Sequence, residues 1–317
     1  MKKAFIYSSI ATTVLASATA ISGVLLSNKI MYLKPKDPDF IVERETKAKR
    51  FDQAWFDNCP KEMLAIQSPN GYELKGIYLK PLQTANTMII CHGVTENKMN
   101  SIKYARMFME LGFNTVVYDH RRHGESGGRT ISYGYYEKFD LQAVVEAIRS
   151  KIGPYAILGI HGESMGAATT LLYAGTIEEE ADFYIADSSF SDFRELLYLI
   201  VKNSLSIKLK LKPAVIITDI ALRLRDGYWM NNVLPKNVIA NIEKPVLFLH
   251  NTHDTFIPAY MTEEMFALKP NNKMIQLFEN GDHAQGFNEN PELYENTIKQ
   301  FLDHYVTGLG SINETAS

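Results

Sequence analysis

Short apolar runs alternate along most of the chain with longer segments that carry apolar residues on one face only. A short apolar run bounded by turn residues is typical of a buried strand, and apolar positions spaced i, i+3, i+4, i+7 indicate a helix packed on a core. Segment 136–150 places Leu141, Val144, Val145 and Ile148 on one such face. We therefore predict strands that alternate with helices, as in a parallel sheet. The predicted strands are 88–91, 114–118, 156–160, 183–186, 245–250 and 273–278.

A hairpin is predicted in front of these strands. Residues 63–67 and 72–79 flank Asn70 and Gly71, and an Asn-Gly pair favours the tight turn between two antiparallel strands. The sheet is therefore expected to begin with an antiparallel pair and to continue as a parallel sheet.

The run 156–160 leads into the sequence HGESMG, in which Ser164 stands between Gly162 and Gly166. A strand, a sharp turn and a helix start of small residues form the context that a nucleophile elbow requires. Glycines on either side of the serine allow backbone segments to approach each other closely. The serine hydroxyl then stands at the N-terminus of a helix, where developing negative charge is favoured. Ser164 is the predicted nucleophile.

An acid and a histidine follow in the order that such a nucleophile needs. Asp254 comes just after the predicted strand 245–250, and His283 lies in the loop beyond 273–278. Of the eight histidines, His283 is the one that follows the acid-bearing strand by one strand, where the general base must be. Asp187, at the end of an earlier strand, is a rival for the role of the acid.

With these residues, the chain resembles the serine hydrolases of the α/β-hydrolase fold over roughly residues 60 to 306. The similarity is greatest to the single-domain esterase, lipase and serine-aminopeptidase-like members. It implies a mostly parallel central sheet with an antiparallel N-terminal hairpin, helices on both faces and a helical cap insertion. It also favours Asp254 over Asp187, because the sequence after Asp254 resembles the acid loop of the family.

Two further loops match the resemblance. The strand 88–91 is followed by the sequence HGVT, and in this family such a loop provides an oxyanion donor, which implies that the backbone N–H groups of Val94 and Met165 form the oxyanion hole. The loop 119–128 resembles the Asp-x-Arg-Gly-His-Gly-x-Ser loop of the family, with Arg122 where glycine is usual. We interpret this loop as support for the oxyanion loop rather than as a metal or phosphate site.

The segment after Asp187 is too long for an ordinary connection between core elements and is predicted to be a cap over the active site. The predicted organisation is a membrane anchor or signal segment at 1–28, a polar stalk at 29–60, a core at 61–187 and 237–306, a cap insertion at 188–236 and a flexible tail at 307–317.

The cap combines apolar residues with lysines. Our hypothesis is that it forms an apolar acyl pocket and leans on anionic lipid headgroups through these lysines. The lysines are Lys202, Lys208, Lys210 and Lys212.

Residues 4–27 carry no charge, and as a helix they would span about 36 Å, enough to cross a hydrocarbon core of about 30 Å. Lys2 and Lys3 precede this segment, and small residues within it resemble cleavage sites. An uncleaved anchor, a cleaved signal peptide and an amphipathic or buried helix are the competing interpretations. We favour the anchor, because the apolar run continues to Leu26 and a signal's apolar core is usually shorter.

The orientation of this anchor is less clearly encoded. Lysines and arginines that follow the segment argue against moving the C-terminal domain across the membrane, whereas the signal-like start favours it. We predict a single-pass protein of the cell membrane with an extracytoplasmic catalytic domain.

Composition excludes other classes of partner. The chain has 317 residues and a formal net charge of −3, without a basic stretch interleaved with aromatics, so nucleic acid is not an expected partner. Its two cysteines, Cys59 and Cys91, cannot form a disulfide framework or a zinc site. No metal or organic cofactor is implied, because the predicted triad needs none.

We expect Ser164, His283 and Asp254 to cleave a carboxylic ester of small or acyl-chain substrates through an acyl-enzyme. An aminopeptidase-like serine peptidase is the alternative, in which a cap carboxylate such as Glu195 or Asp226 would bind the substrate's amine. A non-catalytic binding protein on the same fold is a third possibility, disfavoured by the intact triad.

Overall fold

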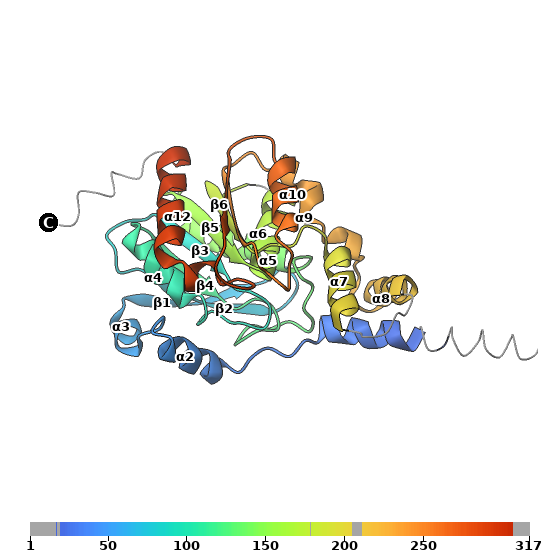
Figure 1. Ribbon diagram of the computed structural model, residues 1–317. Coiled ribbons are helices and arrows are strands. Elements are labelled where there is room, and N and C mark those ends of the chain that lie inside the picture. Colours follow the sequence, from blue (N-terminus) through green and yellow to red (C-terminus); the bar gives the residue numbers. More distant parts are fainter. Residues whose placement is uncertain (1–16, 18–19, 178, 205–210, 307–317) are drawn as a thin grey trace, which may run out of the picture.

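The computed structural model describes residues 17, 20–177, 179–204 and 211–306. Within these residues the centre is an eight-stranded sheet in the order β1-β2-β4-β3-β5-β6-β7-β8 (Figure 1). The hairpin of β1 (Lys61–Gln67) and β2 (Glu73–Leu79) is antiparallel and joins β4 in an antiparallel pairing, and all other pairings are parallel. The parallel strands are β3 (Thr87–Cys91), β4 (Asn114–Tyr118), β5 (Leu158–Glu163), β6 (Phe183–Asp187), β7 (Val246–Asn251) and β8 (Lys273–Phe278). The predicted hairpin, strands and sheet architecture are confirmed.

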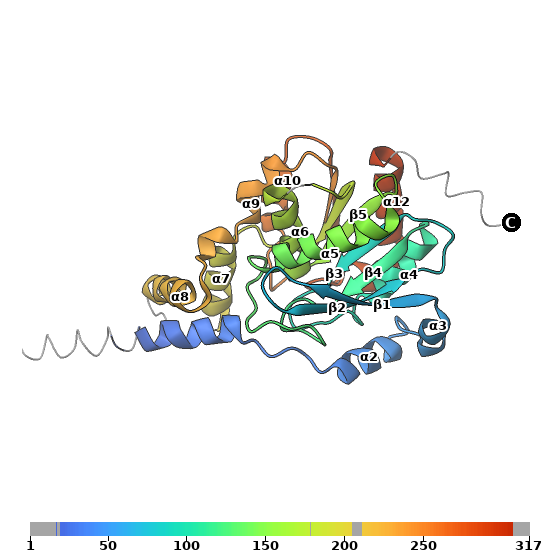
Figure 2. The same cartoon turned by 180° about the vertical axis from the view of Figure 1, so that it is seen from behind.

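Each face of the sheet has its own apolar core, because strand side chains point alternately to opposite faces. On one face, Ile89 belongs to the same core as Leu141 of α5 (Glu137–Ile152). On the other, Ile90 belongs to a core with Phe108 of α4 (Ile102–Glu110) and Phe301 of α12 (Pro291–Tyr305). Figures 1 and 2 show helices on both faces. The first face is also covered by α6 (Met165–Thr176) and α10 (Tyr260–Leu268).

A helical module connects β6 to β7. It consists of α7 (Phe193–Ser204), α8 (Leu211–Asp226), the short helix α9 (Pro235–Val238) and the 3-10 turns Met230–Asn232 and Ile239–Asn241. Phe193, Leu197, Val215 and Leu222 form an apolar cluster that also contains Leu172 of α6. The module therefore has a core of its own that is continuous with one face of α6.

The segment 29–60, which we predicted as a polar stalk, differs from that prediction. It contains α2 (Pro38–Lys47) and α3 (Gln53–Asn58), and Ile41 and Phe51 are buried. Arg44 of α2 donates to both carboxylate oxygens of Glu96, at 3.1 and 2.9 Å. The mixed charges that suggested a solvated stalk are thus partners for charges on the core.

A helix over residues 20–31 precedes α2 and lies against α8 (Figure 2). Thr218 Oγ1 donates to the carbonyl oxygen of Gly23 at 3.3 Å, and Arg225 Nη1 donates to Ser27 Oγ at 2.8 Å. Among the described residues, no helix has both the length and the apolar character needed to cross a membrane. Most of the predicted span 4–27 and the predicted tail 307–317 lie outside the residues that the structure describes.

Candidate active site

Ser164 occupies the sharp turn between β5 and α6, with φ 56° and ψ −115°. A side-chain carbon at Gly162 would overlap the carbonyl oxygen of Gly166, and one at Gly166 would overlap that of Cys91. The turn therefore requires glycine at both positions, which is the reason for the glycine spacing in a nucleophile elbow. A non-glycine residue at positive φ is costly, and such strain is typical of functional positions.

The predicted triad residues meet at this turn. His283 Nε2 lies 2.8 Å from Ser164 Oγ, and His283 Nδ1 lies 2.7 Å from Asp254 Oδ2. Asp254 follows β7 and His283 follows β8, so the carboxyl ends of the parallel strands β5, β7 and β8 bring these residues together, with β6 lying between β5 and β7. The geometry is that of a nucleophile, a general base and a carboxylate that orients the base.

Asp254 is held as a carboxylate. Burial alone would raise its pKa, but hydrogen bonds from His250 and His283 and from the Ile257 backbone outweigh burial and hold the pKa well below its usual value. The backbone N–H groups of Phe256 and Ile257 both donate to Asp254 Oδ1, at 2.8 Å each. A charged Asp254 can stabilise the imidazolium that forms when His283 takes a proton.

The sequence analysis missed two residues that support the triad. His250, fully buried at the end of β7, places Nε2 3.2 Å from Asp254 Oδ2. Asp282 Oδ1 accepts hydrogen bonds from the backbone N–H groups of Thr255 and His283, at 2.8 Å each, and thereby joins the acid loop to the histidine loop. Both lie within four residues of a triad member in sequence, which was the available signal.

Asp187, the rival acid, does not contact His283 among the described interactions. It receives hydrogen bonds from Ser188 Oγ and Tyr294 Oη, both at 2.9 Å. Burial raises the pKa of Asp187 to about 6. Its place beneath the elbow is a supporting one, since Ser164 N donates to the Asp187 carbonyl oxygen at 2.8 Å.

The predicted oxyanion loop is fixed by buried histidines. The backbone N–H of Thr95 donates to His123 Nε2 at 3.1 Å, and that of His120 donates to His92 Nε2 at 3.0 Å. Burial lowers the pKa of the imidazoles of His92, His120 and His123, that of His123 to about 4, so they remain neutral, and His92 and His123 can accept these hydrogen bonds. The loop 119–128 thus supports the oxyanion loop, and Arg122 takes the left-handed φ of 61° that glycine would adopt.

Val94 and Met165 lie beside Ser164, and both line an apolar pocket with it. Their role as oxyanion donors stays a prediction. This pocket measures about 60 Å³. Its other apolar residues include Phe193, Leu197 and Ile200 of α7, so the cap forms one wall.

A second cavity, of about 470 Å³, shares Ser164 and Val94 with this pocket and has a charged lining. Ser164, His283 and Gln285 line this cavity. Charged residues of α2, of α4, of the end of β5 and of the nearby loops also line it. The charged residues are Lys36, Arg44, Glu45, Arg50, Glu96, Lys103 and Glu163. The sequence analysis did not anticipate this charged wall, because its residues come from the segment predicted as a stalk and from the chain before the elbow.

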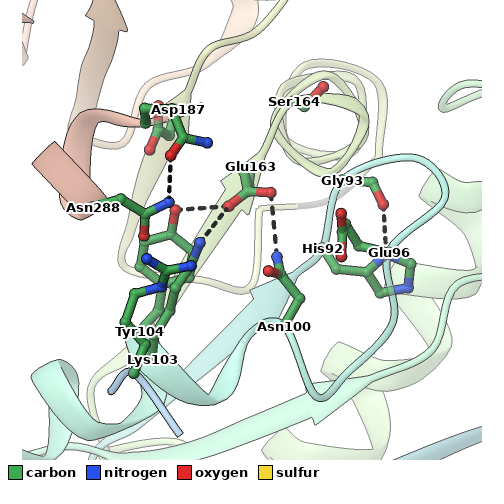
Figure 3. Close-up of polar contacts among 12 residues, drawn as sticks. His92, Gly93, Glu96, Asn100, Lys103, Tyr104, Glu163, Ser164, Asp187 and Asn288 are labelled. Atoms are coloured by element: carbon green, nitrogen blue, oxygen red, sulfur yellow. Dashed lines mark hydrogen bonds and ion pairs between the residues drawn. The ribbon is translucent and has the colours of Figure 1, made fainter. Parts of the chain in front are cut away.

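Glu163, the residue before the nucleophile, organises the charged cavity (Figure 3). Its carboxylate accepts hydrogen bonds from Tyr104 Oη at 2.7 Å and Asn100 Nδ2 at 3.3 Å. Lys103 Nζ lies 3.5 Å from Glu163 Oε2. Figure 3 shows these three side chains pointing toward the Glu163 carboxylate, with Ser164 directed away from them.

The carboxylates proposed for amine binding lie elsewhere. Glu195 accepts from Tyr260 Oη, and Asp226 accepts from Thr130 Oγ1, each at 2.8 Å. Neither residue lines a cavity that contains Ser164. The geometry gives them no contact with the reacting centre.

Comparison with known proteins places these features in context. The family model described as "Serine aminopeptidase, S33" matches residues 83–226. The uncharacterized protein YqkD of Bacillus subtilis is 43% identical over 291 residues, which are 92% of this chain and 95% of YqkD. The uncharacterized protein YfhR of Escherichia coli K12 is 23% identical, with 78% of this chain and 82% of YfhR covered.

Solved structures agree on the fold. The Pyrococcus furiosus esterase Pf2001 superposes with a TM-score of 0.64 at 19% identity, covering 80% of this chain and 97% of the esterase. An esterase from Exiguobacterium antarcticum superposes with a TM-score of 0.56 at 16% identity, covering 76% of this chain and 100% of that enzyme.

Proposed function

Starting from the fact that this chain belongs to the family of Bacillus subtilis YqkD and is a hydrolase of the α/β-hydrolase fold, we propose that it is a serine hydrolase that cleaves carboxylic esters through an acyl-enzyme. The observation that carries the proposal is the continuous hydrogen-bonded chain from Ser164 Oγ through His283 to Asp254, with distances of 2.8 and 2.7 Å. The esterase neighbours support the choice of an ester substrate.

In the first step, Ser164 Oγ attacks the ester carbonyl carbon while His283 Nε2 takes the hydroxyl proton. The carbonyl oxygen becomes an oxyanion, which the N–H groups of Val94 and Met165 stabilise. The bond from carbon to the leaving oxygen then breaks, and His283 gives its proton to that oxygen. Water attacks the acyl-enzyme in the same way, with the proton passing through His283 back to Ser164.

Labelling with a fluorophosphonate tests the nucleophile. We expect the wild-type protein and Ser150→Ala, a surface control on α5, to be labelled and Ser164→Ala not to be labelled. Turnover of p-nitrophenyl esters should be lost with the label. A folded wild-type protein that takes no label would refute the nucleophile and favour the non-catalytic alternative.

The peptidase alternative rests on the family model that matches residues 83–226. Aminoacyl-nitroanilides distinguish it from the esterase. Labelling of Ser164 together with hydrolysis of nitroanilides, and none of esters, would replace the proposal with the peptidase.

We also propose that the protein is held at the cell membrane through residues 4–27, with the catalytic domain outside the cytoplasm. The uncharged sequence supports the tether, and so do apolar side chains exposed on the adjoining surface, with Leu25 59% and Leu224 of α8 80% exposed. Fractionation of expressing cells tests the tether, and protease treatment of spheroplasts tests the orientation. Recovery of the intact protein in the soluble fraction would refute the tether.

A further inference from the structure

The charged cavity beside Ser164 has an excess of cations. Four cationic side chains face three carboxylates in its lining. The carboxylates are already used: Glu96 binds Arg44 and Lys36, Glu45 binds Arg44 and Arg50, and Glu163 has Lys103. One positive charge is therefore unmatched, and a ligand that enters this cavity meets a field that favours anions.

Lys103 makes the longest ion pair of these four cations. Its side chain is only 4% exposed, and within the described part of the chain its single ion pair is the 3.5 Å contact with Glu163 Oε2. Its Nζ also lies 4.8 Å from the centre of the Tyr104 ring, which supplies no hydrogen-bond acceptor lone pair. An ammonium group has three donors and is costly to bury without acceptors. Arg50, by comparison, donates to Glu45 from Nε at 2.7 Å and from Nη2 at 3.3 Å. Lys103 thus retains donor capacity in a cavity that contains Ser164.

The position of His283 indicates which part of a substrate would enter the charged cavity. The general acid must lie within hydrogen-bonding distance of the leaving oxygen. His283 lines the charged cavity but not the apolar pocket, whereas Met165 lines only the apolar pocket and Val94 lies where the two meet. The acyl substituent therefore fits the apolar pocket, and the leaving alcohol fits the charged cavity.

We infer that the protein prefers esters whose leaving alcohol carries an anionic oxygen group, a carboxylate or a phosphate, which binds at Lys103. This inference rests on the proposed ester hydrolysis and leaves the bonds made and broken unchanged. Asn288 Oδ1, a buried acceptor in the same cavity without a hydrogen bond among the described residues, would favour a donor. A neutral amide oxygen carries only a partial charge, so it does not outweigh the unmatched cation.

The test is a series of butyryl esters that differ only in the leaving alcohol. The alcohols are ethylene glycol, which is neutral, glycolate, 2-hydroxyethyl phosphate and choline. We expect kcat/KM of the wild-type protein for at least one anionic ester to exceed that for the glycol ester by about tenfold, the range of one charge-assisted hydrogen bond. The choline ester should be the poorest. The two anionic esters distinguish a carboxylate from a phosphate as the recognised group.

Substitution of Lys103 assigns the preference. In Lys103→Met the ratio of kcat/KM between the preferred anionic ester and the glycol ester should fall to about one, and Lys103→Arg should restore part of it. Lys47→Met is the matched control, because it removes a positive charge from an exposed position on α2 and should keep the wild-type ratio.

Binding without turnover keeps the test independent of catalysis and of how well the variant folds. Glycolate or 2-hydroxyethyl phosphate should raise the Tm of the wild-type protein, and ethylene glycol should not. Hydrolysis of the neutral ester as fast as both anionic esters, or fastest hydrolysis of the choline ester, would overturn the inference and leave the esterase intact. Loss of all ester turnover with no fluorophosphonate label would instead overturn the proposed function.

Discussion

Two cavities meet at Ser164, an apolar one on the side of the cap and a charged one on the side of α2, and the residues that give them their opposite chemistry come from different parts of the chain. On the cap side, α7 supplies apolar side chains to a small pocket. On the other side, α2 and α4 supply ion-paired side chains to a larger cavity. The apolar side needs only bulk and shape, whereas each charge on the polar side needs a partner at hydrogen-bonding distance. Substitutions on the two sides should therefore differ in kind as well as in size.

Asp254→Asn should have the largest effect and should not distinguish the two sides. The amide cannot hold the His283 tautomer that accepts the Ser164 proton, so we expect kcat to fall by about 10⁴ for every ester. Steady-state kinetics with the ester series measures this. A loss confined to the anionic esters would mean that Asp254 acts in binding instead.

Glu163→Gln should perturb the charged cavity and leave the apolar pocket unchanged. It removes the carboxylate paired with buried Lys103, and removing one partner of a buried ion pair costs about 4 kcal/mol of unfolding free energy. Urea unfolding of this variant beside Glu110→Gln, an exposed control on α4, measures the cost. The preference for anionic esters should rise, because the cavity gains a net positive charge. An unchanged preference would separate Glu163 from substrate recognition.

Acid should weaken the loop that supports the oxyanion hole. The pKa of His123 is lowered by burial to about 4 in the folded protein, against about 6.5 in the unfolded chain. The contribution of neutral His123 to the free energy of unfolding is therefore complete above pH 6.5 and is lost as the pH falls toward 4. The shift corresponds to about 3 kcal/mol. Urea unfolding between pH 7 and 4 should show this loss. His123→Asn, which retains a donor and an acceptor, should show a shallower loss, and an equally steep loss would assign the titration elsewhere.

Ile200→Ala should enlarge the apolar pocket and should have the smallest effect on activity of these substitutions. Ile200 is only partly buried, so little stability should be lost, and the longer pocket should shift the acyl optimum toward longer chains by roughly fourfold per added CH₂. Ile220→Ala, at an exposed position on α8, is the control. The chain-length series of p-nitrophenyl esters is the measurement. A shift in the control as large as in Ile200→Ala would show that the pocket wall is not α7.

Prediction from sequence succeeded where local pattern and chain order carry the information. The elbow motif HGESMG depends on residues near one another in sequence, and the order of Ser164, Asp254 and His283 depends on the regular order of parallel strands. The prediction of a polar stalk at residues 29–60 was wrong, because a run of mixed charges is interpreted as solvent-exposed unless its ion-pair partners are known. Arg44 and Glu96 are separated by more than fifty residues, and no local pattern pairs them.

The sequence by itself determined the β–α alternation, the elbow and the identity of the three residues that meet there, because strand periodicity and the glycines of a tight turn are local properties. Tertiary structure alone decided what surrounds Ser164. The place of α2 and α4 at one cavity, the burial of Lys103 beside Glu163 and the contact of His250 with Asp254 all result from packing between distant segments. Burial and distance, which set the energy of every charged contact, exist only once the chain has folded.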